Sequence, residues 1–334
     1  MTDMDGYMRA DGGLRDAEPL VSVILLTYNH RHYIRQAIES VLAQEMPFPC
    51  EVLIGDDASD DGTSEIVAAY ARQYPQLIRA FIRPKNLGAA RNAALLLQEA
   101  RGAFLASLEG DDYWTEPGKL RKQVTFLQEH PRFIGCTTRI RCVDAEGAPV
   151  KGKPAWIRQK RIFTWRDFDG VHLPGQASSL VRRNIFRAPE HDYSVLTRVD
   201  PMISDRTAML LFLLQGDFYC FDEPMSVYRY AAAFRGSNIT SQLAGAEAVK
   251  RDYRITCALE RYAREEFGRQ LTFSRFRREL YAKAWVRGVF DGSREMRELA
   301  RQIREEDAHG WLCGALLPFY MGDMAWRRVV RRLR

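Results

Sequence analysis

The amino-acid sequence predicts an α/β fold in which helices flank a mostly parallel β-sheet, followed by a helical appendage. Three observations lead to this prediction. From residue 20 to about residue 130, short apolar runs alternate with amphipathic stretches, as they do in strand–helix–strand units. Acidic residues directly follow two of the apolar runs. From about residue 244 onward, helix-forming residues dominate and the strand pattern does not return.

The first half of the chain contains four expected strands, each followed by an expected helix. The strands are VSVILLTYN, CEVLIGDD, LIRAFIRP and GAFLASLEGDD, and the helices lie in RHYIRQAIESVLAQ, TSEIVAAYARQY, LGAARNAALLLQEA and KLRKQVTFLQEH. Helices between consecutive strands favour parallel pairing, as in Rossmann-like folds. Pro117 fits the first turn of the last of these helices, and Pro131 marks its end.

The strand–helix alternation breaks after Pro131. A further strand is expected in FIGCTTRIRCVD and a surface turn in EGAPVKGKP, followed by SSLVRRNIF, a helix in SDRTAMLLFLLQG and a strand in FYCFDEPMSVYRY. We therefore predict a disordered tail over residues 1–19, one α/β domain over 20–240 with halves 20–130 and 131–240, and a helical region over 241–334.

Composition and charge exclude several classes of protein. The 334 residues are 46% hydrophobic and 28% charged, as in ordinary globular proteins. The six cysteines lack the spacing of a zinc site, and we expect reduced thiols. The first nineteen residues have no apolar core, and no run of about 18 apolar residues occurs. We therefore expect a cytoplasmic protein.

The net charge of +6 is concentrated at the end of the chain. The last nine residues, WRRVVRRLR, combine five arginines with apolar side chains. This combination is suited to peripheral contact with an anionic membrane. A solvated helical face is the alternative. The sequence carries no nucleic-acid-binding signature, so we predict no nucleic-acid partner.

Polar residues follow three of the expected strands, and we predict the functional site there. They are Thr27, Tyr28 and Asn29 after the first strand, Asp56 and Asp57 after the second, and Glu109, Asp111 and Asp112 after the fourth. Ligands of open α/β sheets bind beyond the carboxyl ends of the strands. Clustered carboxylates raise one another's pKa unless a cation lies among them. Oxygen ligands favour Mg²⁺ or Mn²⁺, which leave positions for substrate phosphates. Helix capping is the alternative role for these acids.

Four segments give the sequence a specific resemblance. VSVILLTYN, LIGDDASDDGT, NLGAARNAAL and SLEGDDYW occur in this order within residues 21–114. Over roughly residues 20–235 the chain resembles family 2 glycosyltransferases of the GT-A fold. In the family's metal-binding motif the first acid is usually Asp, whereas this chain has Glu109 in an EGDDYW form. The resemblance implies an inverting, metal-dependent transfer of a sugar from a nucleoside diphosphate sugar.

The resemblance also implies roles for the donor-binding residues. Tyr28 stacks on the nucleobase, between Thr27 and Asn29, and Arg91 lines the nucleotide pocket. Asp57, with Asp56 beside it, accepts a hydrogen bond from the base imide, which favours UDP- or TDP-sugars because their bases donate from N3–H. Asp112 is the expected direct ligand of Mn²⁺ or Mg²⁺, while Asp111 contacts the metal or the donor ribose.

The second half of the chain is expected to supply the base and the acceptor side. Asp205 is the expected general base, with Asp200 as the alternative residue and helix capping as an alternative role for Asp205. Arg229 is expected near the donor phosphates. The predicted acceptor residues are Trp114, Gln176, Ser178 and Ser179; ordinary packing is the alternative for each.

The sequence thus predicts a transferase that acts on a hydroxyl group of a glycan or lipid-linked acceptor, in bacterial surface polysaccharide synthesis near the inner face of the cell membrane. A noncatalytic nucleotide-sugar-binding module and a nucleotidyltransferase are the alternatives. The loop TYNHRHY contains no glycine for a phosphate-binding loop, and no GxGxxG follows a strand, which argues against a dehydrogenase.

Overall fold

The computed structural model describes residues 18–152, 154, 156–200, 205–229, 245–307 and 310–315. The predictions for the first 17 residues and for the arginine-rich end lie outside these ranges. The chain divides into two compact units, and each is described by itself. The first contains the sheet, and the second contains the helices from residue 245 onward together with residues 169–171.

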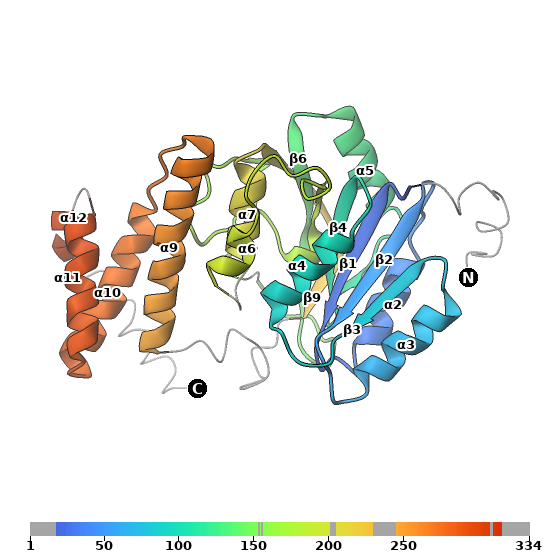
Figure 1. Ribbon diagram of the computed structural model, residues 1–334, viewed down its shortest axis with the longest axis horizontal. Helices are drawn as coiled ribbons and strands as arrows, with labels where there is room; N and C mark the ends of the chain where they lie inside the picture. The colour runs from blue at the N-terminus through green and yellow to red at the C-terminus, as the bar shows by residue number, and fades with distance from the viewer. Residues whose placement is uncertain are drawn as a thin grey trace. The chain divides into compact units, whose positions relative to one another are not determined.

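One mixed sheet forms the centre of the first unit (Figure 1). Its parallel half consists of β1 (Val21–Thr27), β2 (Cys50–Asp56), β3 (Ile78–Ile82) and β4 (Phe104–Glu109). The connecting helices are α2 (Ile34–Leu42), α3 (Thr63–Gln73) and α4 (Ala89–Glu99), and α5 (Lys119–Glu129) follows the acids. The strands and helices of the first half therefore follow the predicted order.

The other half of the sheet is mostly antiparallel. The full strand order is β3-β2-β1-β4-β8-β6-β9-β5, and β7 pairs with β9. The added strands are β5 (Tyr113–Trp114), β6 (Phe133–Val143), β7 (Ile162–Phe163), β8 (Val181–Arg183) and β9 (Asp217–Arg229). Because β5 pairs with β9, the chain turns sharply after β4, and the intervening acids lie in this turn at the carboxyl edge of the sheet.

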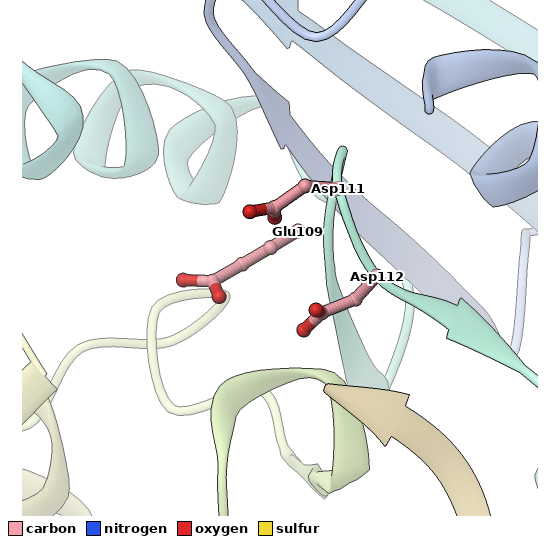
Figure 2. A group of neighbouring side chains, drawn as sticks. All are labelled: Glu109, Asp111 and Asp112. Atoms are coloured by element: carbon pink, nitrogen blue, oxygen red, sulfur yellow. The ribbon is translucent and has the colours of Figure 1, made fainter. Parts of the chain in front are cut away.

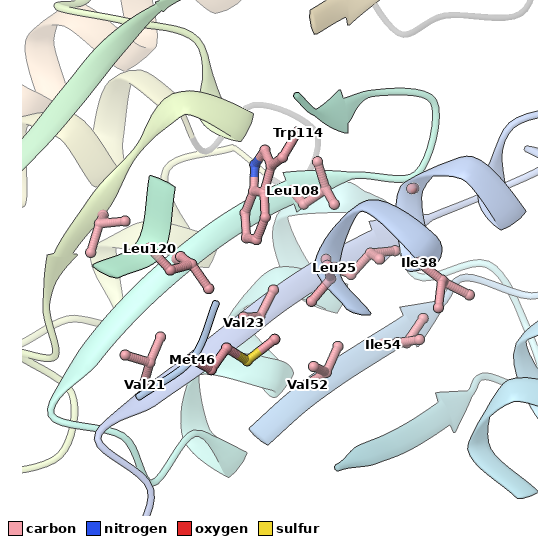
Figure 3. Close-up of a cluster of buried hydrophobic side chains, with 14 of the residues drawn as sticks. Val21, Val23, Leu25, Ile38, Met46, Val52, Ile54, Leu108, Trp114 and Leu120 are labelled. Atoms are coloured by element: carbon pink, nitrogen blue, oxygen red, sulfur yellow. The ribbon is translucent and has the colours of Figure 1, made fainter. Parts of the chain in front are cut away.

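A hydrophobic core holds the sheet against its helices (Figure 3). Val21, Val23 and Leu25 of β1 alternate along one face and are fully buried. Ile38 of α2 and Leu120 of α5 belong to the same cluster. The residues of β1 between these positions are also buried, as expected for a parallel strand covered on both faces.

Shorter elements bring the second half of the chain to the sheet. They are the 3₁₀ turn η1 (Ala177–Ser179), α6 (Val195–Arg198) and α7 (Asp205–Leu213). Gly175 precedes η1, and a Cβ atom at Gly175 would lie 2.0 Å from Thr137 Oγ1. The chain therefore passes directly against β6 just before it enters η1.

The second unit is helical. It consists of α9 (Ala246–Phe267), α10 (Ser274–Phe290), α11 (Arg294–Glu306) and α12 (Gly310–Ala315), with Leu259, Leu280 and Ile303 in its core. Gly268, at φ 60°, ends α9, and Ser293 caps α11 by accepting a hydrogen bond from the Met296 amide at 3.3 Å. Within the part of the chain that the structure describes, no helix is long and apolar enough to span a membrane.

Candidate active site

Three acidic side chains meet in the turn after β4 (Figure 2). One ligand oxygen from each of Glu109, Asp111 and Asp112 lies within 4.8 Å of the others. Gly110 makes this turn possible, because a Cβ atom there would lie 2.6 Å from Thr27 Oγ1 and 2.7 Å from His30 Nδ1. The side chains of Glu109 and Asp111 extend to the same side of the turn.

Asp112 is buried and held by three donors. Its Oδ2 accepts hydrogen bonds from Ser178 Oγ at 2.6 Å and Gln176 Nε2 at 2.8 Å. Its Oδ1 accepts from the Arg229 amide at 2.9 Å. Gln176 Nε2 also donates to Glu109 Oε2 at 2.7 Å, so one amide group supports two of the acids.

The negative charge of the cluster favours the binding of a cation. Burial raises the pKa of Glu109, and the charges of Asp112, Asp111 and Asp205 raise it further. Burial and the charge of Asp111 likewise raise the pKa of Asp112 against the opposing effect of the Ser178 and Arg229 hydrogen bonds. The cluster therefore carries more negative charge than its surroundings compensate.

The oxygen atoms that remain available fit a hard divalent ion. The Asp111 carboxylate accepts no hydrogen bond from any residue within the described ranges, and Glu109 Oε1 has none either. Asp112 has one oxygen, Oδ1, with a single donor. An all-carboxylate ligand set of this kind suits Mg²⁺ or Mn²⁺. The sequence prediction placed Glu109 in the same motif but named only Asp111 and Asp112 as metal residues.

Asp205 is the first residue of α7. Its charge contributes to the raised pKa of Glu109. The protein atoms around the Asp205 carboxyl group raise its own pKa, although the residue is exposed, while Arg206 and Arg182 act in the opposite direction. Asp200, the alternative base, is only 5% exposed.

The residues after β1 present an aromatic ring to solvent. Tyr28 is 44% exposed, whereas Thr27 beside it is buried. Asn29 has a φ of 55°, and its Oδ1 accepts a hydrogen bond from the Asp60 amide at 3.1 Å. This contact fixes the loop that carries Tyr28 against the loop after β2.

The two aspartates after β2 hold neighbouring loops. Asp56 is fully buried and accepts hydrogen bonds from the hydroxyl groups of Ser59 and Ser64. Asp57 is 3% exposed and accepts from the amides of Leu87 and Gly88 at 2.8 and 2.9 Å, just before α4. Arg91 is exposed in the first turn of α4. Each carboxylate oxygen of Asp57 thus already accepts one hydrogen bond from the backbone. The contact between Asp57 and the nucleobase stays a prediction.

Arg229 lies directly beside the acid cluster, because its amide donates to Asp112. Its guanidinium group donates to the carbonyls of Asp111, Asp144 and Ala145 at 3.0–3.1 Å and to Gln36 Oε1 at 3.1 Å. The residue is only 6% exposed, and its guanidinium carbon lies 4.3 Å from the centroid of the Tyr33 ring. These hydrogen bonds show that Arg229 supports the turn of the acids, and its contact with donor phosphates stays a prediction.

The predicted acceptor residues are buried in the structure. Trp114 is 4% exposed in the core (Figure 3), and its indole Nε1 donates to the Ser178 carbonyl at 2.7 Å. Gln176 and Ser178 are buried beneath the acids that they support. Ser179 is buried against Thr137, with 2.6 Å between their hydroxyl oxygens. These four side chains therefore fill the interior, which agrees with the packing alternative, and their contact with an acceptor stays a prediction.

The fold and the acid cluster define a GT-A-type α/β protein, and comparison with known proteins gives the family. The model of glycosyl transferase family 2 matches residues 22–188, half of the chain. The chain belongs to this family. An uncharacterised Mycobacterium tuberculosis protein is 37% identical over 211 residues, which are 63% of this chain and 58% of that protein. The chain thus spans little more than half the length of this curated relative.

Two further similarities concern named proteins. A putative teichuronic acid biosynthesis glycosyltransferase of Bacillus subtilis is 40% identical over 112 residues, 34% of this chain and 43% of that protein. The structure of Staphylococcus aureus TarS 1–349 in complex with UDP-GlcNAc matches with a TM-score of 0.59 at 16% identity and covers 87% of this chain and 81% of TarS 1–349. At this identity the match supports the fold alone.

Proposed function

We propose that this chain is an inverting glycosyltransferase that moves a sugar from a nucleoside diphosphate sugar to a hydroxyl group of its acceptor. The observation that carries the proposal is the cluster of Glu109, Asp111 and Asp112, whose uncompensated charge lies at the carboxyl edge of a parallel sheet. Nucleotides bind at this edge in α/β proteins.

The donor is proposed to be a UDP- or TDP-sugar. The exposed ring of Tyr28 provides a face for the nucleobase, and Asp57 lies beyond the neighbouring strand, where an acceptor for a base N–H is needed. The binding of UDP-GlcNAc by TarS, a protein of similar fold, agrees with this choice. Arg91 is exposed in the first turn of α4, where a cation can contact the nucleotide.

Glu109, Asp111 and Asp112 would hold Mn²⁺ or Mg²⁺. When bound, such an ion neutralises the charge that develops on the leaving diphosphate. Gln176 and Ser178 keep the carboxylates in place by hydrogen bonds from beneath. The buried position of these supports excludes water from one side of the cluster and preserves its geometry.

Asp205 is proposed to accept the proton of the attacking hydroxyl group. It is exposed, its charge raises the pKa of Glu109, and its own raised pKa suits a general base better than an ordinary aspartate would. Attack on the anomeric carbon opposite the leaving diphosphate inverts the configuration without a covalent enzyme intermediate. The acceptor is proposed to be a glycan or lipid-linked sugar of bacterial surface polysaccharide synthesis, at the inner membrane face; the teichuronic acid relative supports this choice.

The first experiment is a thermal-shift panel of UDP, GDP, TDP, CDP and ADP with and without Mn²⁺. A ligand that binds only the folded state raises the melting temperature. We expect metal-dependent stabilisation by a pyrimidine diphosphate and its loss in Asp111→Asn. Asp222→Asn is the matched control, because Asp222 is an exposed aspartate paired with Arg139. The absence of a shift with every nucleotide would overturn the donor assignment.

The second experiment separates catalysis from binding. Asp205→Asn keeps the size of the side chain and removes its basicity, so we expect unchanged nucleotide binding and at least about a hundredfold loss of sugar transfer. Transfer at the wild-type rate would exclude Asp205 as the base. Nucleotide binding by the wild type without transfer to any glycan or lipid-linked acceptor would favour a noncatalytic binding module.

A further inference from the structure

The second unit contains a cavity of about 540 Å³ between helices α9, α10 and α11. Its volume is in the range of small-molecule sites in proteins. The lining is polar and charged: besides Ala258 it consists of Tyr253, Arg254, Cys257, Glu260, Arg261, Arg264, Arg277, Gln302 and Glu306. All of these residues belong to the second unit, so the cavity does not depend on the sheet of the first.

Three of the arginines lie on one face of α9. Arg254 and Arg261 are seven residues apart, and Arg264 follows three residues later, which places all three on the side of the helix that lines the cavity. All three are exposed. Arg254 and Arg261 make no hydrogen bond or ion pair with any residue in the described ranges, and Arg264 only approaches Glu265 at 4.0 Å.

The acids of the cavity do not neutralise these arginines. Glu260 precedes Arg264 by four residues and could pair with it along the helix. Instead, Glu260 is bound by Arg277, and Glu306 accepts from Arg277 NH1 at 3.2 Å and from the Tyr253 hydroxyl group. Arg277 is nearly buried, with 11% of its side chain exposed. The two glutamates are therefore engaged by Arg277 and Tyr253, whereas Arg254 and Arg261 have no ion pair in the described ranges and Arg264 has only the 4.0 Å approach of Glu265.

From this arrangement we propose that the cavity is a binding site for a phosphate-bearing ligand, with Arg254, Arg261 and Arg264 as its anion-binding residues. Guanidinium groups present paired donors that match phosphate oxygens, and hydrogen bonds between two charged groups are stronger than neutral ones. A solvated charged face would carry acids at helical spacing among its arginines. Two acids stand at that spacing: Glu260 is engaged by Arg277, and Glu265, four residues after Arg261, forms no ion pair with Arg261 in the described ranges. The inference does not depend on the proposed sugar transfer.

The test uses the full chain and inorganic pyrophosphate, measured by calorimetric titration in EDTA. EDTA removes divalent cations, so the acid cluster of the first unit cannot hold the anion through a metal. The variant Arg254→Gln/Arg261→Gln/Arg264→Gln removes the three donors. The control Arg275→Gln/Arg294→Gln/Arg301→Gln changes the net charge equally, with three exposed arginines outside the lining.

We expect the wild type and the control to bind pyrophosphate with affinities within about twofold of each other, and the cavity variant to bind at least about tenfold more weakly. The proposal is overturned if the wild type does not bind, if the cavity variant binds as the wild type does, or if the control loses as much affinity. Circular dichroism of both variants shows whether the helices are retained.

A second arm identifies the source of the phosphate. Cosedimentation with phosphatidylcholine vesicles, with and without phosphatidic acid, compares the wild type with the cavity variant. Both proteins keep the arginine-rich end, so a difference between them reports on the cavity. Phosphatidic acid binding that the cavity variant loses supports a lipid phosphate headgroup. Equal vesicle binding together with the pyrophosphate result supports a soluble phosphate ester.

Discussion

At the scale of single residues, hydrogen bonding distinguishes acids whose oxygens are free to bind a metal ion from acids whose oxygens already accept hydrogen bonds from the protein. Asp112 accepts three hydrogen bonds, whereas the Asp111 carboxylate accepts none within the described part of the chain. Sequence reasoning located the pair but could not make this distinction, because Gln176 lies 64 residues away from Asp112 and Ser178 lies 66 away. Local patterns do not report such contacts. For the same reason, the sequence left an acceptor-facing role and ordinary packing open for Gln176 and Ser178.

Ser178→Ala tests whether the hydrogen bonds of Ser178 hold the acid cluster in a metal-binding geometry. The substitution removes the donor to Asp112 and the acceptor of the Glu109 amide. We expect a loss of about 1–3 kcal/mol in the free energy of unfolding and about a 10- to 100-fold loss of sugar transfer and metal affinity. Mn²⁺ titration of the nucleotide-induced thermal shift measures the effect on the metal.

Ser179→Ala is the matched control for this prediction. Ser179 is equally buried, but its hydroxyl group contacts Thr137 and the Gln176 carbonyl instead of an acid. Its loss should lower stability by a similar amount and leave the Mn²⁺ titration nearly unchanged. Equal effects of the two substitutions on the titration would refute the supporting role of Ser178.

Lys119 gives the protein a pH-dependent stability. It is fully buried, and its Nζ has no hydrogen-bond partner among the described residues; its ammonium group lies 4.3 Å from the Trp114 ring centroid. Burial lowers the pKa of Lys119 to about 7, against an opposing effect of Cys136. The unfolded chain, with an ordinary lysine pKa, binds more protons between about pH 7 and 10.5. Stability should therefore rise with pH in this window.

Lys119→Met should abolish this pH dependence. The variant should be more stable than the wild type near pH 7, and the difference should shrink as pH rises, by up to about 1.4 kcal/mol per pH unit. Urea denaturation at pH 7, 8 and 9, monitored by a signal from the first unit, measures this difference in the free energy of unfolding. Lys122→Met, which removes an accessible lysine paired with Glu223, should show no such trend. A constant difference across the three pH values would contradict the prediction.

At the scale of secondary structure, the sequence predicts the parallel half well because its signals are local. Apolar runs and the amphipathic stretches between them place β1, β2 and β4 and the connecting helices. The antiparallel half depends on long-range pairing: β8 inserts between β4 and β6, and β5 pairs with a strand more than a hundred residues away. β5 has two residues and β8 has three, which is too short a pattern to predict the strands with which they pair.

Gly110→Ala tests the turn between β4 and β5. The added methyl group would lie 2.6 Å from Thr27 Oγ1, so the turn must move away from β1. We expect destabilisation of about 1–3 kcal/mol and loss of metal-dependent nucleotide binding, because the acids on either side move with the turn. In Gly118→Ala the new atom would be 3.5 Å from Arg121, an ordinary contact, and both properties should be retained. Normal nucleotide binding by Gly110→Ala would show that the close approach to β1 is dispensable.

At the scale of the whole molecule, the chain divides the proposed functions between two units, each with its own core. The acid cluster depends on the packing of the sheet, and the arginine cavity depends on α9, α10 and α11. The sequence predicted a helical region from residue 241 and assigned a role only to its arginine-rich end. Charge spacing along one helix does not reveal which acids pair with a neighbouring helix. Glu260 and Arg277 show this limit.

This division predicts opposite consequences for two similar core substitutions. Leu105 of β4 and Leu280 of α10 are both fully buried, and each change to Ala should cost about 2–5 kcal/mol in its own unit. Leu105→Ala loosens the strand that carries Glu109 and should weaken Mn²⁺-dependent nucleotide binding. Leu280→Ala should leave that binding within about twofold of the wild type and instead weaken pyrophosphate binding in EDTA. Calorimetric titration below the melting temperature measures both, and loss of nucleotide binding in Leu280→Ala would show that the donor site requires an intact helical unit.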